Sequence, residues 1–318
     1  MPAEHPHVLL SNELLRARVY LPDADRGFYR STRFDWSGIV ADLEAGGHHF
    51  YRPWFTATEP DVFDFVFRGP DIVVGPQSAV TGPTEEFPEP QGYDDAAPGD
   101  TFVKIGVGVL RRPDAAPYSP YAQYEIVSSG DWRVSHGDDW IECVQTLAPS
   151  DRGVGYEYRK RLEVSAGRPE LVITHSLHNT GRATIEATQY NHNFLTIDGA
   201  GTDPDVVLTA PFVMASPHPP DADLALIDDN TVRFRKAFDG EDRFYALLEG
   251  FGPDPIDFDF RLDNRRLGAG VRITGDRRLA RLGLWAIRSV VSIEPFVDVT
   301  THPGETTHWT YQYSFITK

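Results

Sequence analysis

The chain has 318 residues, of which 41% are apolar and 12% aromatic, so it is long and apolar enough to fold around a sizeable core. Acidic residues outnumber basic ones by 47 to 30, and the net charge of −17 argues against nucleic acid and anionic membranes as partners. No stretch reaches the roughly 18 continuous apolar residues of a membrane span.

The chain has a single cysteine, Cys143, which excludes an internal disulfide and cysteine-based zinc or iron–sulfur sites. The segment 1–10 has no basic region followed by an apolar run, so we expect no signal peptide. Together these features predict a cytoplasmic protein.

Turn-forming residues are spread along the whole chain, with 27 glycines and 25 prolines between short β-rich runs. This pattern predicts an all-β fold, a large antiparallel sandwich or a barrel. A β/α fold would need helical runs of about 10–15 residues between the strands, and the sequence has no series of them. No linker interrupts the pattern, so we expect one domain over residues 1–318.

Polar and aromatic residues are concentrated in the first distinctive segment, 27–40. It combines Tyr29, Arg30, Arg33, Asp35 and Trp36. Aromatic faces stack on the C–H surfaces of sugars, while Arg and Asp bind hydroxyls, so the segment suits a carbohydrate site. A surface hairpin with a structural Arg–Asp pair explains the same residues equally well.

A long acidic segment, 81–100, follows; it is rich in Pro and Gly and has no periodicity, which is typical of a functional or disordered loop. After it, alternation predicts one strand over 101–110. Lys104 shares a face of that strand with Gly106 and Gly108, which would leave room for a ligand. An exposed lysine over a twisted sheet is the alternative.

The second half of the chain shows the clearest strand patterns. Residues 157–165 and 170–178 predict a hairpin, and further strands are predicted over 184–194, 291–300 and the last strand, 308–315.

Two ionisable residues in these later strands are candidates for chemistry. His192 shares a strand face with Thr188 and Tyr190, and Glu294 lies in mid-strand before Pro295. Glu is depleted in strands, so a carboxylate there either faces solvent or lines a pocket. Taken alone, each residue also fits a structural role, because most histidines are not catalytic.

Common catalytic motifs are missing from the sequence. It has no nucleophile elbow, P-loop, dinucleotide-binding glycine motif or His-Glu-x-x-His, and it predicts no metal site or cofactor. The pairs His48/His49 and His175/His178 would each face opposite ways on a strand.

Several of these segments occur in an order that resembles a known family. They are GFYRSTRFDWSGIV from residue 27, GPTEEF at 82–87, GDTFVKIGVGVLRR at 99–112, YNHNF at 190–194, and IEPF followed by PGETTHWTYQYSF. Together they resemble the aldose 1-epimerase family of the galactose mutarotase-like superfamily, over nearly the whole chain.

The resemblance implies a fold and two roles. The fold is a large antiparallel β-sandwich, a supersandwich, with sugar bound on a concave sheet face. The family's catalytic histidine follows an Asn, which corresponds to His192 after Asn191, and its catalytic glutamate corresponds to Glu294 before Pro295.

The substrate half of the site departs from the family pattern. The Asn-Arg pair and the second, upstream histidine of galactose mutarotases have no counterpart here, and Arg33, Arg52 and Glu86 occupy that part of the chain. We expect Arg33, Arg52, Glu86 and Lys104 to bind the substrate, with Arg33, Glu86 and Lys104 on its hydroxyls. The remaining expected substrate contacts come from the aromatic residues Trp36 and Tyr158.

The expected activity is interconversion of sugar anomers, with ionised Glu294 as base and protonated His192 as acid. No cofactor is needed, and the partner is a small sugar bound by a monomer or homodimer. The net charge argues against anionic sugars, although local Arg and Lys can override it. Alternatives are a non-catalytic sugar-binding protein, an enzyme for a modified or linked sugar, and an interaction protein with an acidic surface.

Overall fold

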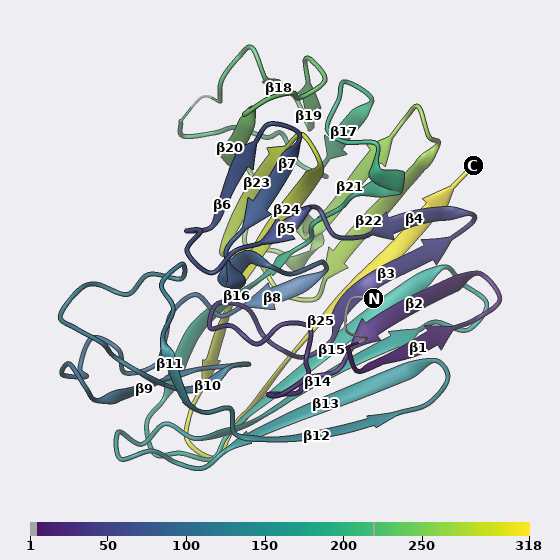
Figure 1. The fold of residues 1–318 in the computed structure, drawn as a ribbon. Coiled ribbons are helices and arrows are strands. Elements are labelled where there is room, and N and C mark those ends of the chain that lie inside the picture. Colours follow the sequence, from purple (N-terminus) through teal and green to yellow (C-terminus); the bar gives the residue numbers. More distant parts are fainter. Residues whose placement is uncertain (1–4, 219) are drawn as a thin grey trace.

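Strands make up nearly all the regular structure of the computed structural model, which describes residues 5–218 and 220–318 (Figure 1). Residues 1–4, part of the segment expected to lack a signal peptide, lie outside the described residues. Among the described strands, pairing is antiparallel except between β5 and β7, and the predominance of strands confirms the predicted all-β class. None of the helices among the described residues has the length and apolar character needed to cross a membrane.

The larger sheet has ten strands in the order β12-β13-β14-β15-β25-β22-β21-β17-β19-β18. Their bounds are β12 Asp131–His136, β13 Trp140–Leu147, β14 Tyr156–Val164, β15 Glu170–Asn179, β25 Thr306–Thr317, β22 Ala269–Gly275, β21 Asp259–Asn264, β17 Val206–Thr209, β19 Thr231–Phe234 and β18 Ala225–Asp228.

A second sheet has five strands in the order β20-β23-β24-β16-β8. Their bounds are β20 Arg243–Leu247, β23 Arg281–Ile287, β24 Val290–Thr301, β16 Ile185–His192 and β8 Thr84–Glu86. β24 contacts β25 and β15, so the two sheets pack against each other. Alternation along β24 shows the consequence, because Val291, Ile293, Val297 and Val299 enter the main core while Ser292, Glu294, Phe296 and Asp298 face the other side.

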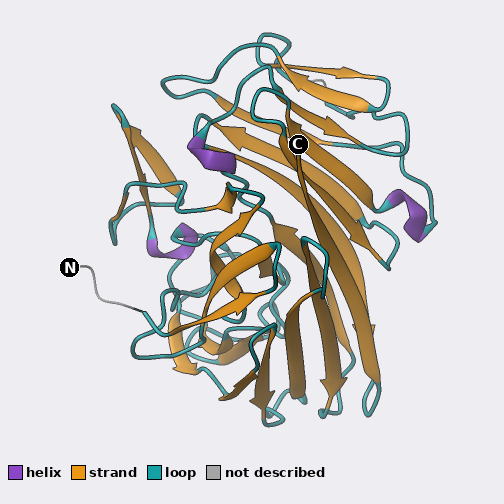
Figure 2. Cartoon of the chain, turned by 90° about the vertical axis from the view of Figure 1, so that its right-hand side faces the viewer, coloured by secondary structure: helices purple, strands orange, loops and turns teal. Residues whose placement is uncertain are grey.

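Smaller elements surround these sheets, and the helices are single turns (Figure 2). The smaller strands are β1 His7–Ser11, β2 Leu15–Tyr20, β3 Ile39–Ala45, β4 His48–Tyr51, β5 Ala57–Thr58, β6 Phe65–Arg68, β7 Asp71–Val74, β9 Thr101–Lys104, β10 Gly108–Arg111 and β11 Glu125–Ser128, and the 3₁₀ helices are η1 Pro76–Ser78, η2 Ile197–Gly199 and η3 Pro255–Asp257. A second apolar cluster, with Phe34, Trp54 and Phe194 among its members, lies apart from the main core.

Most predicted strands are confirmed. β14 and β15 form the predicted hairpin, and β16, β24 and β25 lie where alternation predicted strands. The single strand predicted over 101–110 is wrong: β9 turns back into β10, and Val103 pairs with Val109. Gly106 adopts a φ of 80° in that turn, a conformation that alternating apolar letters do not reveal.

The acidic segment 81–100 is not a structureless loop. It contains β8, which pairs with β16, and Gln91 forms an isolated bridge with Val103. The pattern hides β8 because its three residues, Thr84–Glu86, are all polar although buried, so no apolar face alternates with a polar one.

Candidate active site

A cavity of about 400 Å³ lies on the face of the five-stranded sheet that is turned away from the main core. Its size is that of a small-molecule site. Aromatic side chains provide much of the lining: Trp54, Tyr121, Tyr190, Phe194, Tyr245, Trp285 and Phe296. Its ionisable lining residues other than tyrosine are Arg33, Asp64, Glu86, His192, Arg281 and Glu294.

Strand register arranges the floor of the cavity in rows that cross the sheet. One row runs from Glu86 through Tyr190 and Phe296 to Arg281. The adjacent row contains His192 of β16 and, on the neighbouring hairpin, Glu294 paired with Gly283. Because directly opposed residues share a face, one alternation pattern brings both rows into the cavity.

His192 and Glu294 meet at the centre of this floor. His192 Nε2 lies 3.3 Å from Glu294 Oε1, and His192 Nδ1 lies 2.7 Å from Ser292 Oγ. The imidazole also stacks on Phe194, with ring centroids 3.7 Å apart. The ring is therefore held at both nitrogens and on one face.

Burial shifts the pKa values of this pair in opposite directions. It raises the pKa of Glu294 to about 8, against the lowering effect of the Arg33 charge, and Glu86 adds to the rise. Burial, with Arg33 adding to it, lowers the pKa of His192 well below its ordinary value. At neutral pH the carboxyl is protonated and the imidazole is neutral, so together they carry one transferable proton.

Ser292 is a partner that can follow the movement of that proton. Its Oγ accepts a hydrogen bond from the backbone N–H of Asn193 at 2.9 Å. The hydroxyl can donate to a neutral Nδ1 or accept from a protonated one. Ser292 thus positions the His192 ring in either protonation state.

Arg33 reaches the cavity because hydrogen bonds of the Tyr29 hydroxyl hold its loop in place. The Tyr29 hydroxyl accepts the backbone N–H groups of Arg33 and Phe34 and donates to the carbonyl of Gln77. Arg33 Nε then donates to Glu86 Oε2 at 2.9 Å. The predicted carbohydrate segment 27–40 therefore contributes an arginine held by its own tyrosine.

Glu86 is held by three donors. Besides Arg33, it accepts from Tyr190 Oη at 2.6 Å and from Lys104 Nζ at 3.2 Å. Burial opposes its ionisation, but the charges of Lys104 and Arg33 outweigh burial and keep the pKa of Glu86 below its ordinary value. Glu86 is therefore an ionised acceptor on the cavity wall.

Unusual backbone conformations occur in two cavity residues that are not glycine. Asp64 has a φ of 58° and Phe194 a φ of 36°, in the region that side chains disfavour. Asp64 Oδ1 accepts from Ser78 and lies 3.6 Å from Arg33 Nη1, while Phe194 supplies the ring under His192. Such strain persists where the surroundings impose it, which is common at functional sites.

Some predicted substrate-binding residues lie outside the cavity lining. Trp36 is buried in the second apolar cluster, and Tyr158 is buried between the sheets, where it donates to Asp35. Arg52 is exposed beside Asp42, 3.8 Å away. Lys104 is fully buried and reaches Glu86 and Tyr118 instead of open space. Of the predicted residues, the structure brings together Arg33, Glu86, His192 and Glu294.

Other cavity residues were missed from the sequence. Arg281 and Trp285 had a usable signal, because β23 and β24 form a hairpin in which Ile287 pairs with Val290. Counting back from Glu294 through that turn places both on its face. Asp64 and Tyr121 lie outside strands, where no periodicity predicts them.

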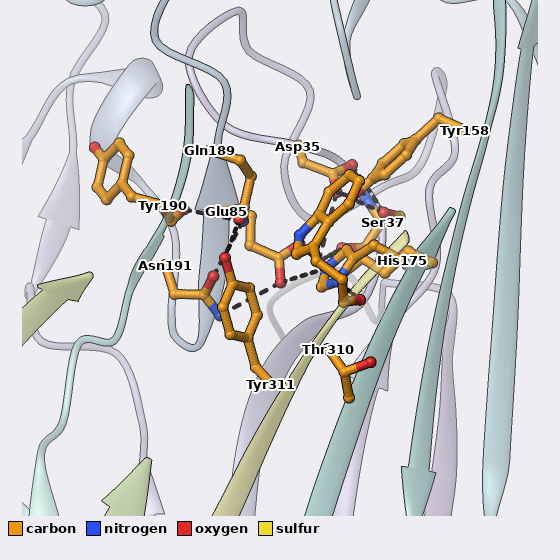
Figure 3. A network of polar contacts seen from close by, with 12 residues as sticks. Asp35, Ser37, Glu85, Tyr158, His175, Gln189, Tyr190, Asn191, Thr310 and Tyr311 are labelled. Atoms are coloured by element: carbon orange, nitrogen blue, oxygen red, sulfur yellow. Dashed lines mark hydrogen bonds and ion pairs between the residues drawn. The ribbon is translucent and has the colours of Figure 1, made fainter. Parts of the chain in front are cut away.

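A second polar network lies behind the cavity, between the sheets (Figure 3). Glu85 is its centre: Oε2 lies 2.5 Å from Lys160 Nζ, and Oε1 lies 3.0 Å from His175 Nε2. Burial opposes ionisation of Glu85, but Lys160 and His175 outweigh it and lower its pKa to about 2. Figure 3 shows Gln189 and Asn191 directed into this network and Tyr190 directed away from it.

Comparison with known proteins identifies the fold. No protein-family model and no curated protein sequence match the chain. Solved structures match along its length, and they define a galactose mutarotase-like β-sandwich, as expected from the sequence.

The matching structures are distant in sequence. A galactose mutarotase-like protein from Clostridium acetobutylicum is 14% identical, with a TM-score of 0.57 and coverage of 99% of this chain and 96% of that one. A galactose mutarotase related enzyme from Lactobacillus acidophilus is 12% identical, with a TM-score of 0.54 and coverage of 97% of each chain. An aldose epimerase homologue from C. elegans is 12% identical, with a TM-score of 0.51 and coverage of 99% and 100%.

Proposed function

We propose that this protein is an enzyme that interconverts the anomers of an aldose, with His192 and Glu294 exchanging protons with the sugar. The observation that carries the proposal is their 3.3 Å contact in a cavity that is lined by aromatic rings. The fold agrees with it, because the matching structures include proteins named as galactose mutarotase related and as an aldose epimerase homologue.

The reaction needs a base and an acid at adjacent atoms. The anomeric hydroxyl must lose its proton while the ring oxygen gains one, so that the bond between C1 and the ring oxygen breaks. The resulting aldehyde rotates, and the ring closes on the opposite face. Both oxygens are bonded to C1, so an acid and a base in mutual contact can address both.

The protonation of the His192–Glu294 pair supports this chemistry with one adjustment. The sequence predicts an ionised Glu294 and a protonated His192, whereas the pKa shifts leave the proton on Glu294. The two states have the same number of protons and differ by one transfer across the 3.3 Å contact. In the proposed reaction this transfer makes Glu294 the base and His192 the acid, and ring closure reverses the roles.

The remaining cavity groups suit a sugar. Glu86, ionised and facing the cavity, can accept hydrogen bonds from hydroxyls, and Arg33 can donate them. Trp285 and Tyr245 offer aromatic faces for the C–H surface of the ring.

Anomer exchange measured by magnetisation-transfer NMR tests the proposal. A panel of free hexoses and pentoses is compared between the wild type, His192→Ala and Glu294→Gln, with His178→Ala as the control because His178 is a partly exposed residue of the larger sheet outside the cavity. We expect exchange on at least one sugar, a loss of about 10²–10⁴-fold in each cavity variant, and no loss in the control.

Other outcomes select other functions. Sugar binding without exchange would indicate a non-catalytic binding protein. A product of altered mass would indicate an enzyme for a modified or linked sugar. Full activity in Glu294→Gln or His192→Ala would remove that residue from the chemistry.

A further inference from the structure

Arg281 is an arginine of the cavity that has no anionic partner. Its guanidinium lies over the ring of Phe296, 3.7 Å from the ring centroid. Among the described residues, no carboxylate lies within ion-pair distance of it and no acceptor takes a hydrogen bond from its side chain. Stacking uses the flat face of the guanidinium and leaves the N–H donors at its edge free.

Among the described arginines that line the cavity, the lack of an anionic partner is specific to Arg281, because the other one, Arg33, is paired. Arg33 lies at the Glu86 end of the same row and is paired with Glu86 and Asp64. Farther along the outward face of β24 from Phe296, Asp298 lies beside Arg278 at 3.5 Å. Burial keeps the pKa of Glu294 at about 8 and outweighs the charge of Arg281, which lowers that pKa, so the carboxyl is protonated at neutral pH. Among the described residues that line the cavity, Arg281 is therefore the arginine without an ion-pair partner.

The distance from the reacting groups matches a single sugar ring. Arg281 lies two residues before Gly283, which pairs with Glu294, so the two positions are about 7 Å apart along the strand. Gly283 leaves room for the Glu294 carboxyl on this part of the sheet, because a Cβ at residue 283 would lie 3.0 Å from Glu294 Oε2. A sugar held at its anomeric centre by Glu294 can thus extend toward Arg281.

We infer that Arg281 binds an anionic substituent, a carboxylate or a phosphate monoester, on the sugar whose anomeric centre meets His192 and Glu294. This inference rests on the proposed function and narrows its substrate class. Arginine is suited to both groups because its fork of donors matches two acceptor oxygens. The net charge of −17 does not oppose such binding at short range, since charges more than about 8 Å away are largely screened at physiological ionic strength.

Matched sugars that differ only in charge test the inference. Anomer exchange is measured with D-glucose and D-galactose, their uronates and their 6-phosphates. For at least one anionic sugar we expect kcat/KM to exceed that of its neutral parent by about tenfold or more, the scale of one charge-assisted contact. The series that shows the advantage, uronate or phosphate, identifies the group.

Variants of Arg281 connect that advantage to this side chain. Arg281→Gln is expected to remove it and Arg281→Lys to retain part of it. Arg278→Gln, which removes a neighbouring positive charge outside the cavity, is expected to keep it. If neutral sugars are exchanged as well as anionic ones, or if the advantage survives in Arg281→Gln, the inference is wrong and the proposed epimerase stands.

The absence of exchange on all six sugars and on the neutral panel would contradict the proposed epimerase instead. Titration of tryptophan fluorescence then decides the role of Arg281, because Trp54 and Trp285 line the cavity. Saturable quenching by a uronate or a sugar phosphate that is lost in Arg281→Gln would support anion binding at Arg281. No difference between the wild type and Arg281→Gln would overturn it.

Discussion

Glu85 and Glu86 are neighbours in β8, yet their carboxylates serve different sides of the five-stranded sheet. Glu86 faces the cavity and pairs with Arg33, whereas Glu85 faces the larger sheet and pairs with Lys160. β16 repeats the arrangement, since Tyr190 bonds to Glu86 and Asn191 lies 3.4 Å from Glu85. The strands that form the cavity floor are thus anchored from behind by ions in the core.

Breaking that anchor should destabilise the fold. Glu85→Gln leaves the Lys160 ammonium, which is 1% exposed, without its closest carboxylate. Removing one partner of a buried pair costs about 3–5 kcal/mol of the free energy of unfolding. Urea denaturation checks this, with Glu157→Gln as the matched control at a partly exposed ion pair, where a loss below about 1 kcal/mol is expected. Equal losses in both variants would show that the Lys160 pair is not an anchor.

The raised pKa of Glu294 has a cost in stability. The unfolded chain releases this proton near pH 4.5 and the folded chain only near pH 8, so the folded state binds more protons between these values and stability falls as pH rises. Gln cannot ionise. The unfolding free energy of Glu294→Gln minus that of the wild type should therefore increase by roughly 3–5 kcal/mol as the pH rises from 4.5 to 8. The same difference between the two proteins at both pH values would contradict the assignment.

The pH dependence of activity follows from the shared proton. Above about pH 8 Glu294 loses its proton while His192 is neutral, and the pair has none to transfer. Well below pH 6.5 both groups are protonated, and the pair has no base. We predict a plateau of kcat/KM between these limits, measured on the best sugar of the panel. An activity that keeps rising above pH 9 would show that ionised Glu294 and neutral His192 are the working state.

Ser292 should act as a positioning residue for His192. It is fully buried behind the imidazole, so it does not touch the sugar in the proposed complex. Ser292→Ala should lower kcat by about 10- to 100-fold, leave KM nearly unchanged, and move the acid limb of the pH profile to lower pH. Ser292→Thr, which keeps the hydroxyl, should restore most of kcat. A purely structural role would predict no movement of the pH limb.

Prediction from sequence succeeded where alternation and motif coincide. His192 and Glu294 were identified because each lies on a polar strand face and also falls in a motif that resembles the aldose 1-epimerase family. Arg281 could have been found by the same alternation across the β23–β24 turn.

The failures have physical reasons. Lys104 was assigned to the site because the sequence of the β9–β10 turn alternates like a continuous strand. Tyr158 was assigned to it because alternation does not say which face of a sheet meets the core. The contacts of Arg33 with Asp64 and Glu86 depend on how separate segments meet in space, which no local pattern encodes.

The central claim is that His192 and Glu294 work as one unit with one transferable proton. Anomer exchange rates of His192→Ala, Glu294→Gln and the double variant test it most directly. Each single change should cost about 10²–10⁴-fold, and the double variant should be no slower than the worse single variant, because removing either group disables the unit. Losses that multiply in the double variant would show that the two residues act independently, and would contradict the account.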